Sequence, residues 1–108
     1  MKKPINADYF IDMFNIYSVK LLDTVFPIVR DNRVDSLVVS EIEDNGNITV
    51  RYNSRRLGHV SKGELLACVF HELRHIQQGI MKYETEKQKI EQELDAESHT
   101  LKMLALHF

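Results

Sequence analysis

Five consecutive residues, His71-Glu72-Leu73-Arg74-His75, form the pattern HExxH within a stretch that has the periodicity of an amphipathic helix. On a helix, histidines four residues apart lie on one face, where both imidazoles can bind one zinc ion. Glu72 lies beside them and is a candidate general base. The pattern therefore predicts a zinc site, and the elements that position it decide whether the site is complete.

The helix that carries the pattern is expected to begin at Ser61, because residues 61–64 match a capping box. Apolar residues follow one side of this helix: Leu66, Val69, Phe70, Leu73, Ile76 and Ile80. His71, Glu72 and His75 fall on a second side. A lone histidine is usually structural, but two histidines and a glutamate on a separate face favour metal binding.

The last helix must supply a third ligand, because a catalytic zinc has three protein ligands and an open position for water. Residues 85–88 match a second capping box, which predicts a helix from there to the C-terminus. Its candidate ligands are Glu93, Asp95, Glu97 and His99. Its apolar stripe is expected to comprise Ile90, Leu94, Leu101, Leu104, Ala105 and Phe108.

Glu93 and Glu97 lie at or within that apolar stripe, whereas Asp95 and His99 point away from it. An acid turned toward a core is costly unless it is paired or bound to metal. The stripe therefore favours Glu93 and Glu97 as site residues. The alternative is a solvated charged face, since residues 87–93 are rich in Lys and Glu.

The two motifs together resemble the HExxH plus ExxxD zinc metallopeptidases, the gluzincins, and especially their small ImmA/IrrE-like members. The matching downstream segment is residues 93–97, Glu-Leu-Asp-Ala-Glu, with Glu97 where the family usually has Asp or Asn. The resemblance implies that His71, His75 and Glu93 bind one Zn²⁺ per chain. It also implies that Glu72 activates a zinc-bound water, and that Glu97 orients a ligand histidine.

The N-terminal part is expected to form a helix from residue 7 to about residue 24, with Asn6 as its N-cap and Pro27 stopping or kinking its end. Its apolar stripe comprises Tyr9, Phe10, Met13, Phe14, Tyr17, Leu21 and Leu22. A β-hairpin is predicted next, with strands over residues 37–42 and 48–52. Asn45-Gly46 fits a type I′ turn between them.

A two-residue loop would place Val39 opposite Tyr52 and Glu41 opposite Val50. The residues that then share the face toward the helices are Val39, Ile48, Val50 and Tyr52. Residues 53–60 are expected to form a loop. The prediction is thus one α+β domain over residues 1–108, in which an N-terminal helix, a small antiparallel sheet and two site-bearing helices form a minimal zincin core.

The function expected from these residues is that of a zinc metallopeptidase, which hydrolyses peptide bonds and binds an extended peptide or protein substrate at the edge of the hairpin. A second donor to the transition-state oxyanion is also expected. The candidates, none of which is selected by its spacing, are His59, Tyr52, Tyr83, Arg55 and Arg56, with Cys68 as a possible pocket residue.

Two other functions fit the sequence. The first is a non-catalytic zinc-binding or protein-interaction module that keeps the same fold, which suits a chain of 108 residues with little material for a substrate subdomain. The second is a helical structural protein in which HExxH is accidental.

Composition narrows the partners and the location. A net charge of −2 lacks the basic signature of proteins that bind nucleic acid or membrane surfaces, so neither partner is expected. No segment is apolar enough to span a bilayer. The single cysteine, Cys68, cannot form an internal disulfide and indicates a reducing compartment. We therefore expect a cytoplasmic protein, with export by an unusual route as the minor alternative.

Overall fold

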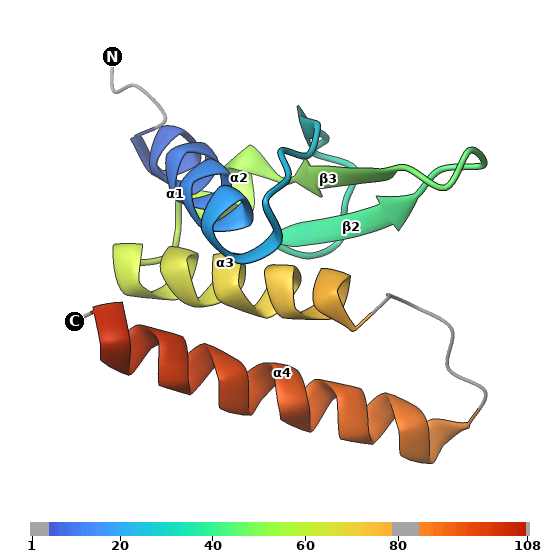
Figure 1. Ribbon diagram of the computed structural model, residues 1–108. Coiled ribbons are helices and arrows are strands. Elements are labelled where there is room, and N and C mark those ends of the chain that lie inside the picture. Colours follow the sequence, from blue (N-terminus) through green and yellow to red (C-terminus); the bar gives the residue numbers. More distant parts are fainter. Residues whose placement is uncertain (1–4, 79–84, 108) are drawn as a thin grey trace.

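The computed structural model describes residues 5–78 and 85–107, so Ile80, Tyr83 and Phe108 of the predictions above lie outside the described residues. The helices are α1 (Ile5–Leu22), α2 (Ser54–Leu57), α3 (Lys62–Gln77) and α4 (Glu86–His107), and the strands are β1 (Ile28–Arg30), β2 (Val38–Ile42) and β3 (Ile48–Tyr52). Figure 1 shows three layers, with α1 and the sheet on one side of α3 and α4 on the other. The predicted α+β class is confirmed.

Helix α1 packs on the sheet and on α3 through its apolar side, as predicted. Phe10 and Phe14 are fully buried, and the Phe10 ring lies 5.9 Å from that of Tyr52 on β3. The N-cap prediction for Asn6 is wrong, because α1 begins at Ile5. The Asn6 side chain instead donates hydrogen bonds to the carbonyl oxygens of Leu57 and Val60, at 2.7 and 3.0 Å.

The C-terminus of α1 is set by Asp23 rather than by Pro27. The helix ends at Leu22, and Asp23 has a φ of 52°, a left-handed conformation that Asp tolerates better than most residues. The prediction that Pro27 ends the helix is therefore wrong. Pro27 precedes β1, and its carbonyl oxygen accepts a hydrogen bond of 2.8 Å from the Val50 amide.

The sheet has three strands in the order β1-β3-β2. The predicted hairpin is confirmed, since β2 pairs antiparallel with β3. Strand β1 was not predicted; it pairs parallel to β3 with Ile28 opposite Val50, so the sheet is mixed. Three residues after a proline are too short to show an alternating pattern. Strand β2 is consequently an edge strand.

The hairpin register differs by one residue from the prediction. Val38 lies opposite Tyr52 and Ser40 lies opposite Val50. Gly46 has a φ of +86°, whereas a type I′ turn would also require a positive φ at Asn45, which Asn45 does not have. The Gly46 amide donates to the Glu43 carbonyl, and this longer connection shifts the pairing by one position.

A one-residue shift reverses which side chains of β2 face the helices. Val38 and Ser40 point inward and are each 6% exposed. Glu41 points outward, where it accepts a hydrogen bond of 2.9 Å from Arg51. The predicted inward position of Val39 is therefore wrong, and a serine occupies the inner face directly beside α3.

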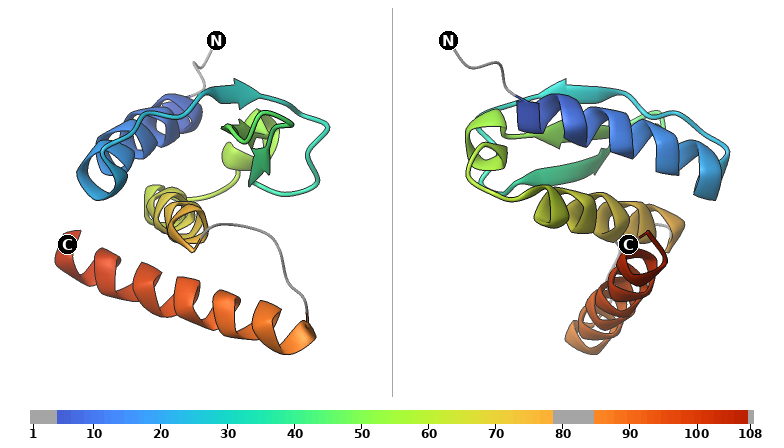
Figure 2. Two further views of the ribbon diagram at one scale, coloured as in Figure 1. Left: turned by 45° about the vertical axis from the view of Figure 1, so that its right-hand side comes forward. Right: turned by 90° about the vertical axis from the view of Figure 1, so that its left-hand side faces the viewer.

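Helix α3 occupies the centre of the fold. The predicted capping box at Ser61 is confirmed, and the buried residues on the core side of α3 are Leu65, Leu66, Val69, Phe70 and Leu73. The preceding residues are not all loop, because α2 forms one helical turn capped by the Asn53 side chain. The two views in Figure 2 show α4 crossing α3 rather than running alongside it.

Helix α4 contacts α3 through a different side from the one predicted. The Gln88 amide donates to the Thr85 side chain at 3.2 Å, as expected at the helix start. Ala96 and Thr100 are buried, whereas Ile90, Leu94 and Leu101 are 57%, 65% and 61% exposed. The spacing of the apolar residues predicted the wrong contact side of α4, because small and polar residues of α4 contact α3. Among the described residues, no helix has the length and apolar content needed to cross a membrane.

The turn geometry generates a stability prediction. Gly46→Ala should lower the free energy of unfolding by about 1 kcal/mol, because an L side chain strains a left-handed backbone. No atom lies within 4 Å of the position of the added Cβ, so the cost is conformational.

The control is Gly63→Ala in α3, where the nearest atom would lie at 3.8 Å and the change should raise stability by up to about 1 kcal/mol. Urea unfolding measures both. Equal shifts for the two variants would contradict the turn assignment.

Candidate metal centre

His71 and His75 lie one turn apart on α3, on a side separate from its core residues. Both side chains are only partly exposed, at 28% and 14%. Their rings meet edge to face, with centroids 4.6 Å apart and an interplanar angle of 81°. This is the four-residue spacing that the sequence predicted for two ligands on one helix face.

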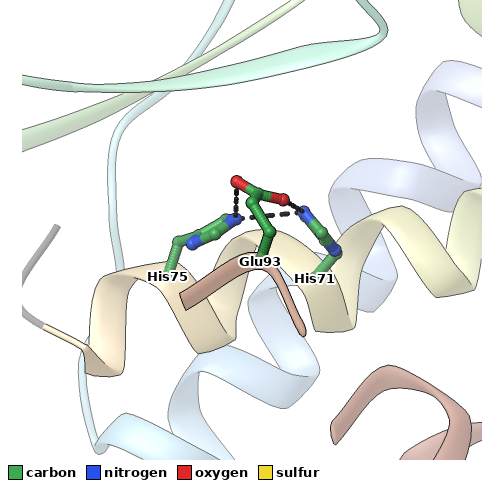
Figure 3. A group of neighbouring side chains, drawn as sticks. All are labelled: His71, His75 and Glu93. Atoms are coloured by element: carbon green, nitrogen blue, oxygen red, sulfur yellow. Dashed lines mark hydrogen bonds and ion pairs between the residues drawn. The ribbon is translucent and has the colours of Figure 1, made fainter. Parts of the chain in front are cut away.

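A carboxylate from α4 completes a group of three (Figure 3). The Nε2 atoms of His71 and His75 are 3.0 Å apart. Glu93 Oε2 lies 3.4 Å from His71 Nε2, and Glu93 Oε1 lies 3.2 Å from His75 Nε2. Donor atoms around a tetrahedral ion with bonds of about 2.0–2.1 Å are separated by about 3.3–3.4 Å. With one donor atom taken from each residue, the three atoms lie within 4.8 Å of one another, so the triad is close enough to hold one metal ion.

The chemistry of the donors also fits a cation. Burial and the neighbouring His75 lower the pKa of His71 below its usual value, although the charges of Glu93 and Glu97 oppose this. His71 is therefore neutral at neutral pH, as a ligand must be. Two imidazoles and one carboxylate suit zinc and other borderline divalent ions, and three protein ligands leave a position open.

Glu93 reaches the histidines, as the resemblance implied, but not from a buried stripe. Its side chain is 46% exposed. It also lines a shallow surface pocket of about 390 Å³ on the outer side of α4, together with Glu86, Lys89, Ile90, Leu94 and Glu97. The expectation that a buried acid needs a metal therefore does not explain the position of Glu93. The crossing of α3 and α4 explains it, because it brings Glu93 to the rim of the histidine pair.

Glu97 is exposed and lies one turn beyond Glu93 on α4. Its negative charge partly opposes the lowering of the His71 pKa by burial. In the part of the chain that the structure describes, it forms no hydrogen bond with His71 or His75. The orienting role that the resemblance implied for Glu97 has no contact to support it.

A different residue contacts one of the two histidines. Gln78, the C-cap of α3, places Oε1 3.0 Å from His75 Nδ1. Gln78 Nε2 donates to the Asp95 carboxylate at 2.6 Å and to the Gln92 carbonyl at 3.0 Å. Arg74 binds the same carboxylate through two nitrogens, at 2.8 and 3.2 Å.

Asp95 points away from the apolar stripe, as predicted, but that stripe is not the packed side of α4, and Arg74 and Gln78 both reach Asp95 from α3. The sequence analysis missed this network. The sequence did contain one signal for Arg74. It is an x position of HExxH, directly before His75, and so lies close to the side of the helix that carries the histidines. Nothing in the sequence, however, fixed the register of α4 that selects Asp95 as its partner.

Glu72 points toward the sheet. Its Oε2 accepts a hydrogen bond of 2.8 Å from the Ser40 hydroxyl, at the inward position of β2. Burial raises the pKa of Glu72 above its ordinary value, while the Ser40 hydrogen bond and the charge of His75 oppose that rise. A carboxyl group with a raised pKa beside a metal site and an edge strand is suited to accept and return a proton.

The other sequence candidates lie elsewhere. Tyr52 is 8% exposed and packs in the core, so its ring is not available to a substrate. His59, Arg55 and Arg56 are exposed near α2. Within the described segments, none of these four forms a hydrogen bond or ion pair with the triad. Tyr83 lies outside the described residues.

No family model, curated protein or solved structure matches this chain. The likeness to gluzincins therefore depends on the two short motifs and on the triad that they form.

Cys68 lies one turn before Glu72 on α3 and packs against the core. Burial, together with the nearby charge of Glu72, raises the pKa of its thiol from 9.0 to about 12. The reactive thiolate is therefore scarce at neutral pH, which fits a pocket wall or core residue rather than a metal ligand.

The raised pKa predicts that Cys68 reacts slowly with thiol reagents. At about pH 8, the native protein should react with a thiol reagent such as iodoacetamide at least about 100-fold more slowly than the denatured protein. Because the native pKa is the higher one, the difference should narrow as the pH rises toward the native value. Alkylation followed by mass spectrometry measures both rates, and equal rates in the two states would contradict the raised pKa.

Proposed function

We propose that this protein is a zinc-dependent metallopeptidase. The observation that carries the proposal is the convergence of donor atoms of His71, His75 and Glu93 within 4.8 Å of one another, with Glu72 next in sequence to His71. Zinc is preferred because two imidazoles, one carboxylate and an open position form the ligand set of catalytic zinc in peptidases. A bound zinc ion would supply a Lewis acid that polarises a carbonyl and makes water more acidic.

Glu72 is the proposed base. Its carboxylate accepts a proton from the attacking water and passes it to the leaving amine, so the peptide bond breaks without a covalent enzyme intermediate. The Ser40 hydroxyl holds the carboxylate at one position and lowers the cost of its charge in a buried place. The Arg74–Asp95 ion pair, at 2.8 Å, holds the Glu93-bearing helix against the histidine-bearing helix.

Strand β2 is the proposed substrate-binding element. It is an edge strand, so an extended peptide can add to it through backbone hydrogen bonds. Ser40 connects this strand directly to Glu72. A peptide on this edge would therefore run close to the proposed base.

One observation favours the non-catalytic alternative, a zinc-binding or interaction module. Among the described residues, none of the four candidate oxyanion donors outside the triad contacts it, and Tyr52 is buried in the core. Such a module would bind zinc through the same three side chains and would have no turnover.

The metal ligands can be tested independently of catalysis. The purified protein should bind one zinc ion per chain, and zinc should raise its melting temperature. Glu93→Gln should weaken zinc binding at least about tenfold, since even indirect partners of metal ligands are worth about 10–100-fold. Glu91→Gln, a matched change at an exposed position of the same helix, should bind like the wild type. Titration calorimetry measures both, and indistinguishable affinities would refute Glu93 as a ligand.

The role of Glu72 is tested with the zinc-loaded protein. Glu72→Gln should keep its zinc but lose about 10²–10⁴-fold in the rate of peptide cleavage, measured with a library of quenched fluorescent peptides. Glu64→Gln, a change on the exposed first turn of the same helix, should keep full activity. A wild-type protein that binds zinc and cleaves no peptide would favour the interaction module.

A further inference from the structure

We infer that Gln78 and Asp95 are positioning residues that fix the proton of His75 on Nδ1, so that the Nε2 lone pair faces Glu93 and His71. This inference deepens the proposed function, and its metal-binding consequence rests on it. It is not part of the family resemblance, which assigned the orienting role to Glu97.

The orientation of the Gln78 amide follows from its partners. One end of the amide lies 2.6 Å from Asp95 Oδ2 and 3.0 Å from the Gln92 carbonyl oxygen. Both partners are acceptors, so this end must be the NH₂ group. The other end, Oε1, can only accept. It lies 3.0 Å from His75 Nδ1, which must therefore carry the proton.

A protonated Asp95 could donate to this end of the amide, whereas the Gln92 carbonyl can only accept and by itself requires the NH₂ group there. Arg74 binds Asp95 with two nitrogens, at 2.8 and 3.2 Å. Both Asp95 oxygens therefore accept from Arg74, and the order Arg74, Asp95, Gln78, His75 has one arrangement of donors and acceptors.

The consequence lies at the other ring nitrogen. A neutral imidazole with its proton on Nδ1 has a lone pair on Nε2. That atom is 3.0 Å from His71 Nε2 and 3.2 Å from Glu93 Oε1, so an ion bound between them would take the place that a proton on Nε2 would otherwise occupy. The opposite tautomer would direct an N–H bond into the place of the ion. Because of the Gln78 contact, the His75 proton does not have to move from Nε2 to Nδ1 when a metal ion binds.

The same residues also hold α4 in register. Gln78 and Arg74 are on α3, whereas Asp95 and the Gln92 carbonyl belong to α4, close to Glu93 along the chain. One network therefore sets both the tautomer of one ligand and the location of another. Replacement of Gln78 should therefore change the tautomer of His75 even in a protein that keeps its fold.

The tautomer is read directly in the metal-free protein by long-range ¹H–¹⁵N NMR of the histidine rings, at about pH 8, where imidazoles are neutral. The wild type should show His75 protonated at Nδ1. Gln78→Leu should show a mixture of tautomers and, after addition of zinc, about 10–100-fold weaker binding. The control is Glu91→Leu, which makes a polar-to-leucine change at an exposed position of α4 and should change neither property.

Gln78→Leu keeps a side chain of similar size and removes only the polar groups, so a change of the His75 tautomer in this variant separates positioning from simple packing. The inference is overturned if the wild type carries the proton on Nε2, or if Gln78→Leu leaves both tautomer and zinc affinity unchanged. Because the tautomer is measured without metal, an Nδ1 proton in a protein that fails to bind zinc would reject the proposed function and still support the positioning role.

Discussion

Helix α3 is the element on which the rest of the structure depends, because it packs against other elements on two sides. Its core side buries residues such as Leu65, Val69 and Leu73 against α1 and the sheet. Its other side presents His71 and His75 toward α4. The side chains of a helix turn together, so the packing of the core side fixes the direction of the histidines.

The contact between α3 and α4 is polar where most helix pairs are apolar. Arg74, Gln78 and Asp95 form its hydrogen bonds, and the small residues Ala96 and Thr100 allow the close approach. Large apolar side chains of α4 remain on the outer surface. A contact of this kind contributes geometric specificity rather than a large hydrophobic stabilisation, and it places the Glu93 carboxylate beside the two histidines.

The sheet makes a second connection to the site through a single hydrogen bond. Ser40 faces inward only because the connection around Gly46 shifts the hairpin register by one residue. In the alternative register, Glu41 would face Val50 on the inner side, and a second carboxylate would approach Glu72. Like charges in a buried place repel each other, so the observed register both pairs Glu72 with a donor and keeps Glu41 in solvent with Arg51.

The sequence by itself determined the local features, because each depends on residues close together in the chain. The four-residue spacing of His71 and His75, the capping box at Ser61 and the apolar side of α1 all follow from helix periodicity and from backbone groups that need partners. The existence of the hairpin follows likewise from two β-rich stretches around Asn45-Gly46.

Only the tertiary structure decided how these elements meet. The apolar stripe of α4 suggested a buried Glu93, yet its contact side is set by polar pairs between Arg74, Gln78 and Asp95, for which hydrophobic periodicity carries no signal. The partner of Glu72 depended on a one-residue difference in the pairing of β2 with β3, which the turn residues alone did not specify. Such contacts join residues far apart in the chain, and their free energy exists only once the core of α3 has fixed the distances between them.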